Sequence, residues 1–80
     1  MKENKLPKWF DGTVYSQGDS VTNPFSGESY ELNNLELSVY DLIIGINTLN
    51  VWTDKTIDLH QKSLKWFRTN NPKAYMVLLD

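Results

Sequence analysis

Residues 32 to 52, LNNLELSVYDLIIGINTLNVW, decide the fold, because their apolar positions follow a helical period and not an alternating one. At about 100° per residue, one set of apolar side chains falls within about 120° of arc, the width of a stripe that faces a core. Asn33 followed by Glu36 is typical of an N-terminal capping box, so we expect the helix to begin there and to end between residues 50 and 52. The stripe comprises Leu35, Val39, Leu42, Ile43, Ile46 and Leu49.

The same helix carries a second apolar stripe, whose centre lies about 170° from Leu35 on the helical wheel. A helix that is apolar on two sides must be covered on two sides, by the rest of the chain or by a partner. Gly45 lies inside this helix, where it costs about 1 kcal/mol relative to Ala. We expect another backbone or a ring to approach it closely, with simple tolerance of the glycine as the alternative. The second stripe comprises Leu37, Tyr40, Ile44 and Val51.

Residues 53 to 71, TDKTIDLHQKSLKWFRTNN, predict a second helix capped by Thr53 or Asp54. One half of its helical wheel is apolar and includes Phe67, whereas the other half is polar and basic. Trp66 is expected at the border of the basic half. The cations of that half are Lys62, Lys65 and Arg68.

The chain then continues with NNPKAYMVLLD, residues 70 to 80. Asn71 as a cap and Pro72 at the first helical position predict a short helix over residues 72 to 79. A terminal strand, AYMVLL, is the competing prediction.

Residues 12 to 33 alternate short β-favouring pieces, TVYS, SVTN and ESYEL, with the turn clusters SQGD and NPFSGE. This pattern predicts a small antiparallel hairpin or meander. In the second turn, Pro24 sets φ at about −65° and Gly27 can adopt the positive φ that closes the loop. Tyr30 and Leu32 lie on the same side of their strand, and Val21 can face them if the strands pair in register.

Eighty residues form a single small domain, residues 1 to 80, whose core is marginal in size. The absence of Cys and the single His exclude disulfides and a thiolate zinc site, so a partner subunit is the remaining source of stability. We expect residues 1 to 6 to be frayed and the next stretch to be anchored by Trp9 and Phe10. No apolar signal segment follows the N-terminus, and the central run LIIGI is far shorter than the roughly 20 residues that cross a bilayer. A soluble protein with no membrane association is therefore expected.

The inventory of catalytic side chains is small. His60 is the only imidazole and lies in the apolar arc of the second helix, which favours a structural histidine over a base or ligand. Asp54 and Asp58 are one turn apart, and they offer too few oxygens for calcium or magnesium, so we expect them to complement the helix N-terminus. The sequence contains no phosphate-binding loop, zinc-ligand spacing or nucleophile elbow. We therefore expect no enzyme, no cofactor and no metal site.

Charge is segregated along the chain although the net charge is only −2. Residues 28 to 41 carry acids without cations, and residues 62 to 73 carry cations without acids, which is typical of solvated helix faces that attract each other. The basic face also offers phosphate contacts beside a ring, the combination that single-stranded nucleic acids require. Three or four cations on a net-acidic chain give a weak footprint, however, so nucleic acid is not the favoured partner. This face comprises Lys62, Lys65, Trp66 and Arg68, and Lys73 could extend it.

Two stretches, VTNPFSGESYELNNLELSVYDLIIG and NPKAYMVLLD, resemble small uncharacterised proteins of tailed phages, particularly myoviruses, of marine bacteria. The resemblance spans roughly residues 8 to 80. It implies a setting in the cytoplasm of an infected bacterium and a role in particle assembly or in adjusting host metabolism. It brings no activity, cofactor or catalytic residue.

Together these features predict an α+β fold, mainly α, in which an N-terminal β-hairpin or meander precedes an antiparallel helical pair and a short C-terminal helix. The leading functional hypothesis is a non-enzymatic module that self-associates, most simply as a homodimer, with a phage or host protein as the other possible partner. A nucleic-acid-binding accessory protein is the alternative. The residues expected to make the self-association contact are those of the second stripe, Leu37, Tyr40, Ile44 and Val51.

Overall fold

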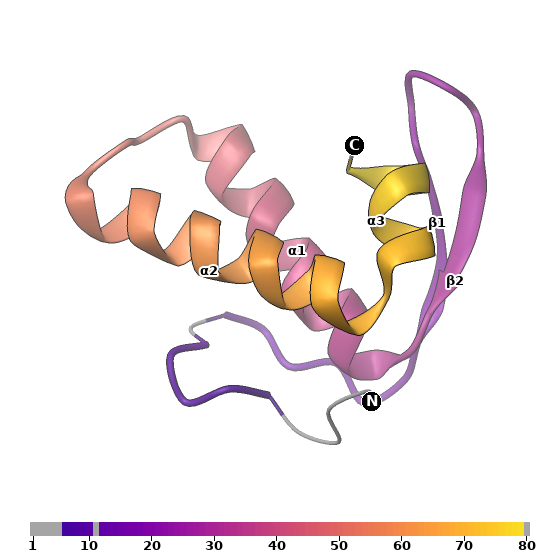
Figure 1. Cartoon of the computed structure of the whole chain (residues 1–80), viewed down its shortest axis with the longest axis horizontal. Helices are drawn as coiled ribbons and strands as arrows, with labels where there is room; N and C mark the ends of the chain where they lie inside the picture. Colours follow the sequence, from indigo (N-terminus) through magenta and orange to yellow (C-terminus); the bar gives the residue numbers. More distant parts are fainter. Residues whose placement is uncertain (1–5, 11, 80) are drawn as a thin grey trace.

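Two strands and three helices follow one another in the computed structural model, which describes residues 6 to 10 and 12 to 79. Figure 1 shows α2 passing in front of α1, and α3 lying between the end of α2 and the hairpin. The predicted α+β fold of mainly helical content is confirmed, and the C-terminal element is the helix, not the strand. The elements are β1 (Asp19–Thr22), β2 (Ser29–Leu32), α1 (Asn34–Leu49), α2 (Asp54–Asn70) and α3 (Pro72–Leu78).

Strands β1 and β2 form a two-stranded antiparallel hairpin. Val21 is paired with Tyr30, as the predicted register requires. Gly27 adopts a φ of 77°, in the left-handed region that glycine enters without steric cost, and this closes the turn between the strands. The local turn chemistry in the sequence is therefore confirmed.

The segment before β1 does not add a third strand, so the prediction of a strand at residues 13 to 16 is wrong. The backbone N–H of Tyr15 donates to Oγ of Ser38 in α1 at 2.9 Å, and the Ser38 hydroxyl donates to the carbonyl of Asn34 at 2.7 Å. A buried hydroxyl on a helix thus takes a backbone donor that a strand ladder would otherwise use. The described β structure is a hairpin and not a meander.

Side-chain caps fix where the helices begin. The side chain of Asn33 accepts from the N–H of Glu36, and the Glu36 carboxylate accepts from the N–H of Asn33, which confirms the predicted capping box of α1. Thr53, not Asp54, caps α2. Helix α1 ends where Asn50 adopts the left-handed conformation with φ of 54°, at the N-terminal limit of the predicted range.

A buried polar link joins the starts of α1 and α3. Glu36 is only 2% exposed, and its second carboxylate oxygen accepts from Nδ2 of Asn71 at 3.1 Å. Oδ1 of the same asparagine accepts from the N–H of Ala74 at 3.2 Å and so caps α3. One carboxylate therefore holds two helix starts in a fixed relation.

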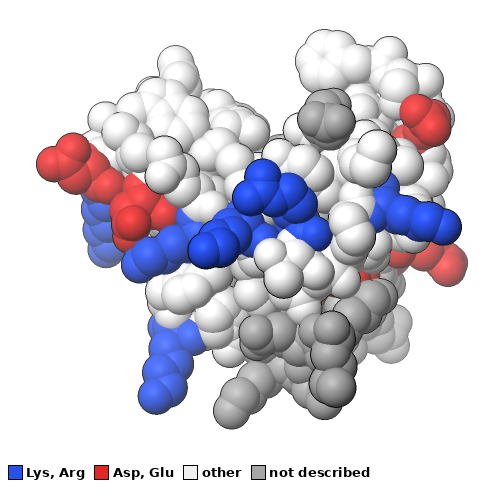
Figure 2. Space-filling model, viewed as in Figure 1, with Lys and Arg blue, Asp and Glu red and all other residues white. Residues whose placement is uncertain are grey.

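The outward half of α2 carries its cations, as predicted. Figure 2 shows Lys and Arg as a band across the face that Figure 1 presents, with acidic side chains near the start of α2. Nζ of Lys62 lies 3.0 Å from a carboxylate oxygen of Asp58, and the guanidinium of Arg68 lies 5.9 Å from the ring centroid of Tyr75. Asp54 lies in the first turn of α2, where an acid is favoured.

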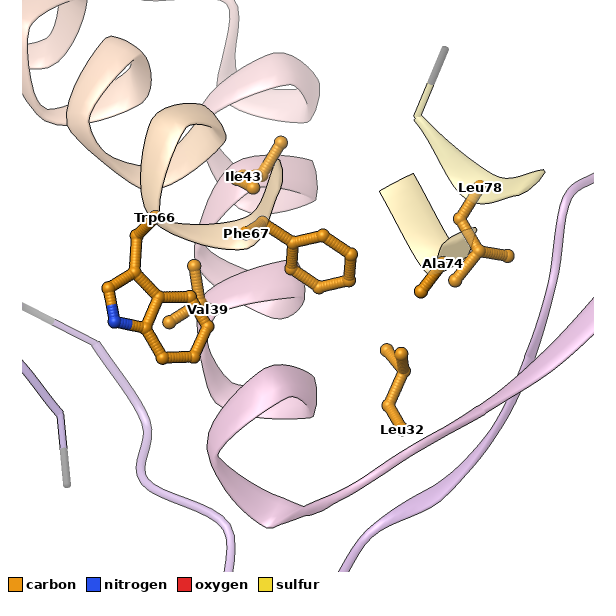
Figure 3. Packing of buried hydrophobic residues seen from close by; sticks show 7 residues of the cluster. All are labelled: Leu32, Val39, Ile43, Trp66, Phe67, Ala74 and Leu78. Carbon is orange, nitrogen blue, oxygen red and sulfur yellow. The ribbon is translucent and has the colours of Figure 1, made fainter. Parts of the chain in front are cut away.

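The core gathers apolar side chains from β2 and all three helices (Figure 3). Phe67 is fully buried among them, as its place on the apolar half of α2 predicts. Leu49 was expected in the core stripe but is 75% exposed, because the buried positions of α1 end at Ile46 and the last turn extends beyond the cluster. The clustered residues are Leu32, Val39, Ile43, Trp66, Phe67, Ala74 and Leu78.

The segment before the hairpin contributes to the same core. Leu6, Trp9 and Phe10 are partly buried and pack against it, which confirms the predicted anchoring by the two aromatic residues. Leu6 falls in the stretch that was expected to fray, and the rest of that stretch, residues 1 to 5, lies outside the described residues.

Gly45 is not approached by another backbone or a ring, contrary to the prediction. A Cβ atom at Gly45 would meet nothing within 4 Å. Close approach occurs instead at Gly18, before β1, where a Cβ would collide with the carbonyl oxygen of Leu32 and lie 2.8 Å from Cα of Asn33. The glycine that close packing requires is therefore Gly18, which lies against the end of β2.

Candidate interaction surface

A groove of about 320 Å³, whose described lining residues are all uncharged, lies between the tip of the β-hairpin, the outer side of α1 and the end of α3. We call it the hairpin-tip groove. Figure 2 shows the lobe of the hairpin tip and α3, with an acidic side chain at its outer edge, on one side of a cleft, and the uncharged lobe of the α1–α2 connection on the other. The residues that give the groove its character are Phe25, Tyr40, Ile44, Asn47, Leu78 and Leu79.

Phe25 stands at the rim of this groove and is 98% exposed. The turn that carries it is held by Asn23, whose Oδ1 accepts from the N–H of Phe25 at 2.8 Å and whose backbone carbonyl accepts from the N–H of Gly27 at 2.8 Å. Nδ2 of Asn23 donates to the carbonyl of Val77 in α3 at 2.9 Å. The turn is therefore tied both internally and to α3, which also lines the groove, while the ring that it presents stays in solvent.

The structure brings two of the four predicted contact residues into the groove. Tyr40 and Ile44 lie on adjacent turns of α1 and line it together. Ile44 is 37% exposed, whereas Tyr40 also packs inward, with its ring centroid 6.3 Å from that of Phe67, and burial raises the pKa of its phenol. Leu37 is half-buried and packs against the core. Helix α1 ends before Val51, so that residue lies on a different part of the surface.

The connection from α1 to α2 forms a second apolar surface, which we call the turn surface. Trp52 is 45% exposed, donates from Nε1 to Oδ1 of Asn50 at 2.8 Å, and meets the ring of His60 edge-on with centroids 5.2 Å apart. Nε2 of His60 is buried without a hydrogen-bond partner among the described residues, and burial lowers the pKa of this imidazole. The exposed side chains of the turn surface are Leu49, Val51, Trp52 and Ile57.

The predicted nucleic-acid face is only partly assembled. A groove of about 350 Å³ along α2 combines Lys62 and Lys65 with Trp9, which the sequence did not indicate. Trp66 also lines this groove but is only 8% exposed, so its ring is not available for stacking on a base. Arg68 lies over an aromatic ring of α3 and does not line the groove.

The described residues, 6 to 10 and 12 to 79, contain no cluster of three side chains that could hold a metal ion. Asp58 is paired with Lys62, and Asp54 lies in the first turn of α2. The helices in this part of the chain are also too short or too polar to cross a membrane.

Periodicity in the sequence identified Tyr40 and Ile44, but it missed the residues that complete the groove. Phe25 had a local signal, because a large aromatic inside the turn cluster NPFSGE has no strand position from which to reach the core. Leu78 and Leu79 had no such signal, because their place beside α1 depends on contacts distant in the sequence. No protein family, curated protein or solved structure matches this chain.

Proposed function

We propose that this protein is a non-enzymatic interaction module that associates with itself through the hairpin-tip groove. The observation that carries the proposal is Phe25, which is 98% exposed on a hydrogen-bonded turn beside the hairpin-tip groove. Isolated surface apolar residues are ordinary, but a large apolar ring beside apolar groove walls is typical of an interaction site. Tyr40 and Ile44 provide the α1 side of the contact, as the second stripe predicted.

Energy and size both favour association through this surface. Moving a phenylalanine side chain from water into an apolar site stabilises a complex by about 1.5 to 3 kcal/mol. A standard interface covers about 800 Å² per partner, which is about one seventh of the 5546 Å² surface of this chain. A surface that includes the groove, its rim and the neighbouring side of α3 could reach this size. Leu37 packs against the core and Val51 belongs to the turn surface, so neither lines the groove.

The setting proposed for this activity is the cytoplasm of a phage-infected bacterium. The likeness of residues 21 to 45 and 71 to 80 to small myovirus proteins supports it. In that setting a self-associating module would serve in particle assembly or in adjusting host metabolism. A phage or host protein with a complementary apolar segment is the other partner that this surface fits.

The test is the mass of the protein in solution as a function of concentration. Sedimentation velocity from low to high micromolar concentrations should show the parent chain passing from monomer to dimer. Ile44→Glu should shift this transition to higher concentration, because a carboxylate would be buried in an apolar contact. Val14→Glu is the matched control, because Val14 is 61% exposed and does not line the groove. A parent that remains monomeric at high micromolar concentration would refute self-association.

A second function, binding of single-stranded nucleic acid, is favoured by one observation. Trp9 lies in a groove with Lys62 and Lys65, which combines a partly exposed ring with two cations. Lys62 is already paired with Asp58, so the electrostatic contribution is small. A salt titration of binding to a labelled oligothymidine, with Lys65→Glu against Lys55→Glu on the first turn of α2, tests it. Absence of binding at low salt would remove this function.

A further inference from the structure

We propose that the self-associated form is a two-fold dimer in which Phe25 of each copy occupies the hairpin-tip groove of the other. This inference rests on the proposed function and adds the arrangement of the partner. Its occupant is a second copy of this chain, and the observation behind it is that one molecule presents a protruding ring and an apolar groove side by side.

Two-fold symmetry requires each partner to use the same surface. Phe25 lies on the wall of the groove and points away from the molecule, so the ring and its proposed site belong to one patch. The rotation that places one Phe25 in the opposite groove therefore places the second Phe25 in the first groove. The contact closes on itself, and no apolar groove is left to recruit a third copy.

The turn is built to hold this geometry before the partner arrives. Asn23 accepts from the N–H of Phe25 and donates to the carbonyl of Val77, the residue before Leu78, which lines the groove. A single side chain thus sets the spacing between the ring and the groove of the same molecule. An ordered turn loses little conformational freedom on association, which preserves the gain from burying the ring.

The chemistry of the groove suits a neutral aromatic ring. The described residues that line it are all uncharged, so Phe25 of a second copy meets no carboxylate or ammonium among them. Ile44 and Leu78 supply aliphatic surface, and Tyr40 supplies a ring against which Phe25 of the partner can pack. Asn47 lies at the exposed side, where its amide remains available to water.

The turn surface is a poorer candidate for the same symmetric contact. Trp52, its largest side chain, already packs edge-on against His60 and donates its N–H to Asn50. Neither the hairpin-tip groove nor the groove along α2 is lined by Leu49 or Val51. Joining the hairpin-tip groove of one copy to the turn surface of another would also leave both features unpaired at the ends, and the chain of copies would grow.

A charge-exchange experiment tests the arrangement. Phe25→Lys removes the ring and keeps the groove, whereas Ile44→Glu damages the groove and keeps the ring. Each variant alone should dimerise at least about a hundredfold more weakly than the parent, because both ring contacts are lost. An equimolar mixture should form heterodimers, because one intact Phe25 meets one intact groove and Lys at position 25 meets Glu at position 44 in the other contact. Native mass spectrometry distinguishes the three species by mass.

The outcomes separate the arrangement from self-association itself. A monomeric parent would refute both. A dimeric parent whose Phe25→Lys variant still dimerises, or whose two variants fail to recover a dimer on mixing, would overturn the exchange of Phe25 and leave self-association standing. Far-ultraviolet circular dichroism checks that each variant folds, and Asn47→Glu, at an exposed position of the groove, replaces Ile44→Glu if the latter unfolds.

Discussion

The side chain of Asn71 makes two structural hydrogen bonds: its oxygen caps α3, and its nitrogen donates to the buried carboxylate of Glu36. Asn71→Ala should lower the free energy of unfolding by about 2 to 4 kcal/mol, of which about 1 is the lost cap and the rest is the lost hydrogen bond to a buried carboxylate. Urea unfolding followed by circular dichroism measures the change. Asn71→Asp keeps the capping acceptor but faces Glu36 with a second acid, so it should be no more stable than the alanine variant. A loss below about 0.5 kcal/mol for Asn71→Ala would show that the link contributes little.

No close contact in the described part of the chain requires a glycine at position 45. A Cβ there would meet nothing within 4 Å, so Gly45→Ala should raise the free energy of unfolding by about 0.5 to 1 kcal/mol through helix propensity alone. The comparison belongs at low micromolar concentration, where the chain is expected to be monomeric. Gly27→Ala is the contrasting variant, because Gly27 holds a positive φ and the substitution should destabilise the protein. A destabilised Gly45→Ala monomer would contradict the open space seen beside α1.

His60 makes stability depend on pH in a defined direction. Burial lowers the pKa of its imidazole below the ordinary value of 6.5, so the unfolded chain takes up the proton first as the pH falls. The contribution of neutral His60 is therefore complete above the unfolded pKa and is lost as the pH falls from there toward the lower folded pKa. Urea unfolding between about pH 7.5 and about pH 5 should show a steeper loss for the parent than for His60→Gln. Equal slopes would mean that His60 titrates alike in both states.

At the scale of elements, the joint between β1, β2 and α1 depends on Gly18. A Cβ at this position would collide with the Leu32 carbonyl oxygen, which is backbone and cannot rotate away. Gly18→Ala should therefore lower the free energy of unfolding by about 2 to 4 kcal/mol. Gly27→Ala, whose Cβ would stand in open space, should cost only the roughly 1 to 2 kcal/mol of a left-handed backbone. Thermal unfolding compares the two, and a similar loss for both would argue against the close approach at Gly18.

Elements with local signals could be predicted from the sequence. The Asn33–Glu36 capping box, Pro72 at the start of α3 and Gly27 in the hairpin turn each act through bonds or dihedral angles within a few residues. The strand expected at residues 13 to 16 failed for a non-local reason, because Ser38, more than 20 positions away, accepts from its backbone. Local propensity could not reveal that competition.

In the candidate site, too, the sequence predicted the residues with a local pattern and missed those placed by tertiary packing. Helical periodicity placed Tyr40 and Ile44 on one outer stripe of α1, and both line the hairpin-tip groove. The same periodicity extended the stripe to Val51, but the helix ends before it, because Asn50 turns the backbone into the left-handed region. The other walls of the groove come from the hairpin tip and from α3, whose packing against α1 is a property of the tertiary structure.

At the scale of the whole molecule, the cations of α2 lie apart from the hairpin tip. Figure 2 shows them as a band below the lobe of the hairpin tip and the lobe of the α1–α2 connection, so a partner at the hairpin tip need not cover them. Lys62 and Arg68 are in addition engaged within the chain, by Asp58 and by the ring of Tyr75. A partner that docks at the groove therefore leaves the basic face of α2 open to a second, weaker contact.

Self-association should also be visible in the thermal stability of the whole molecule. A dimer of folded chains is favoured by mass action, because the unfolded chain lacks the surface that binds. Once dimers dominate, each tenfold rise in protein concentration should add about 0.7 kcal/mol per chain, which for a domain of this size raises the Tm by about 3 to 6 °C. Differential scanning fluorimetry across a hundredfold range of concentration measures this slope. Phe25→Lys should have a flat profile and match the parent at the lowest concentration, because Phe25 is 98% exposed in the monomer and contributes nothing to its core. A parent Tm that does not change over this range would show that the chain does not dimerise through the groove.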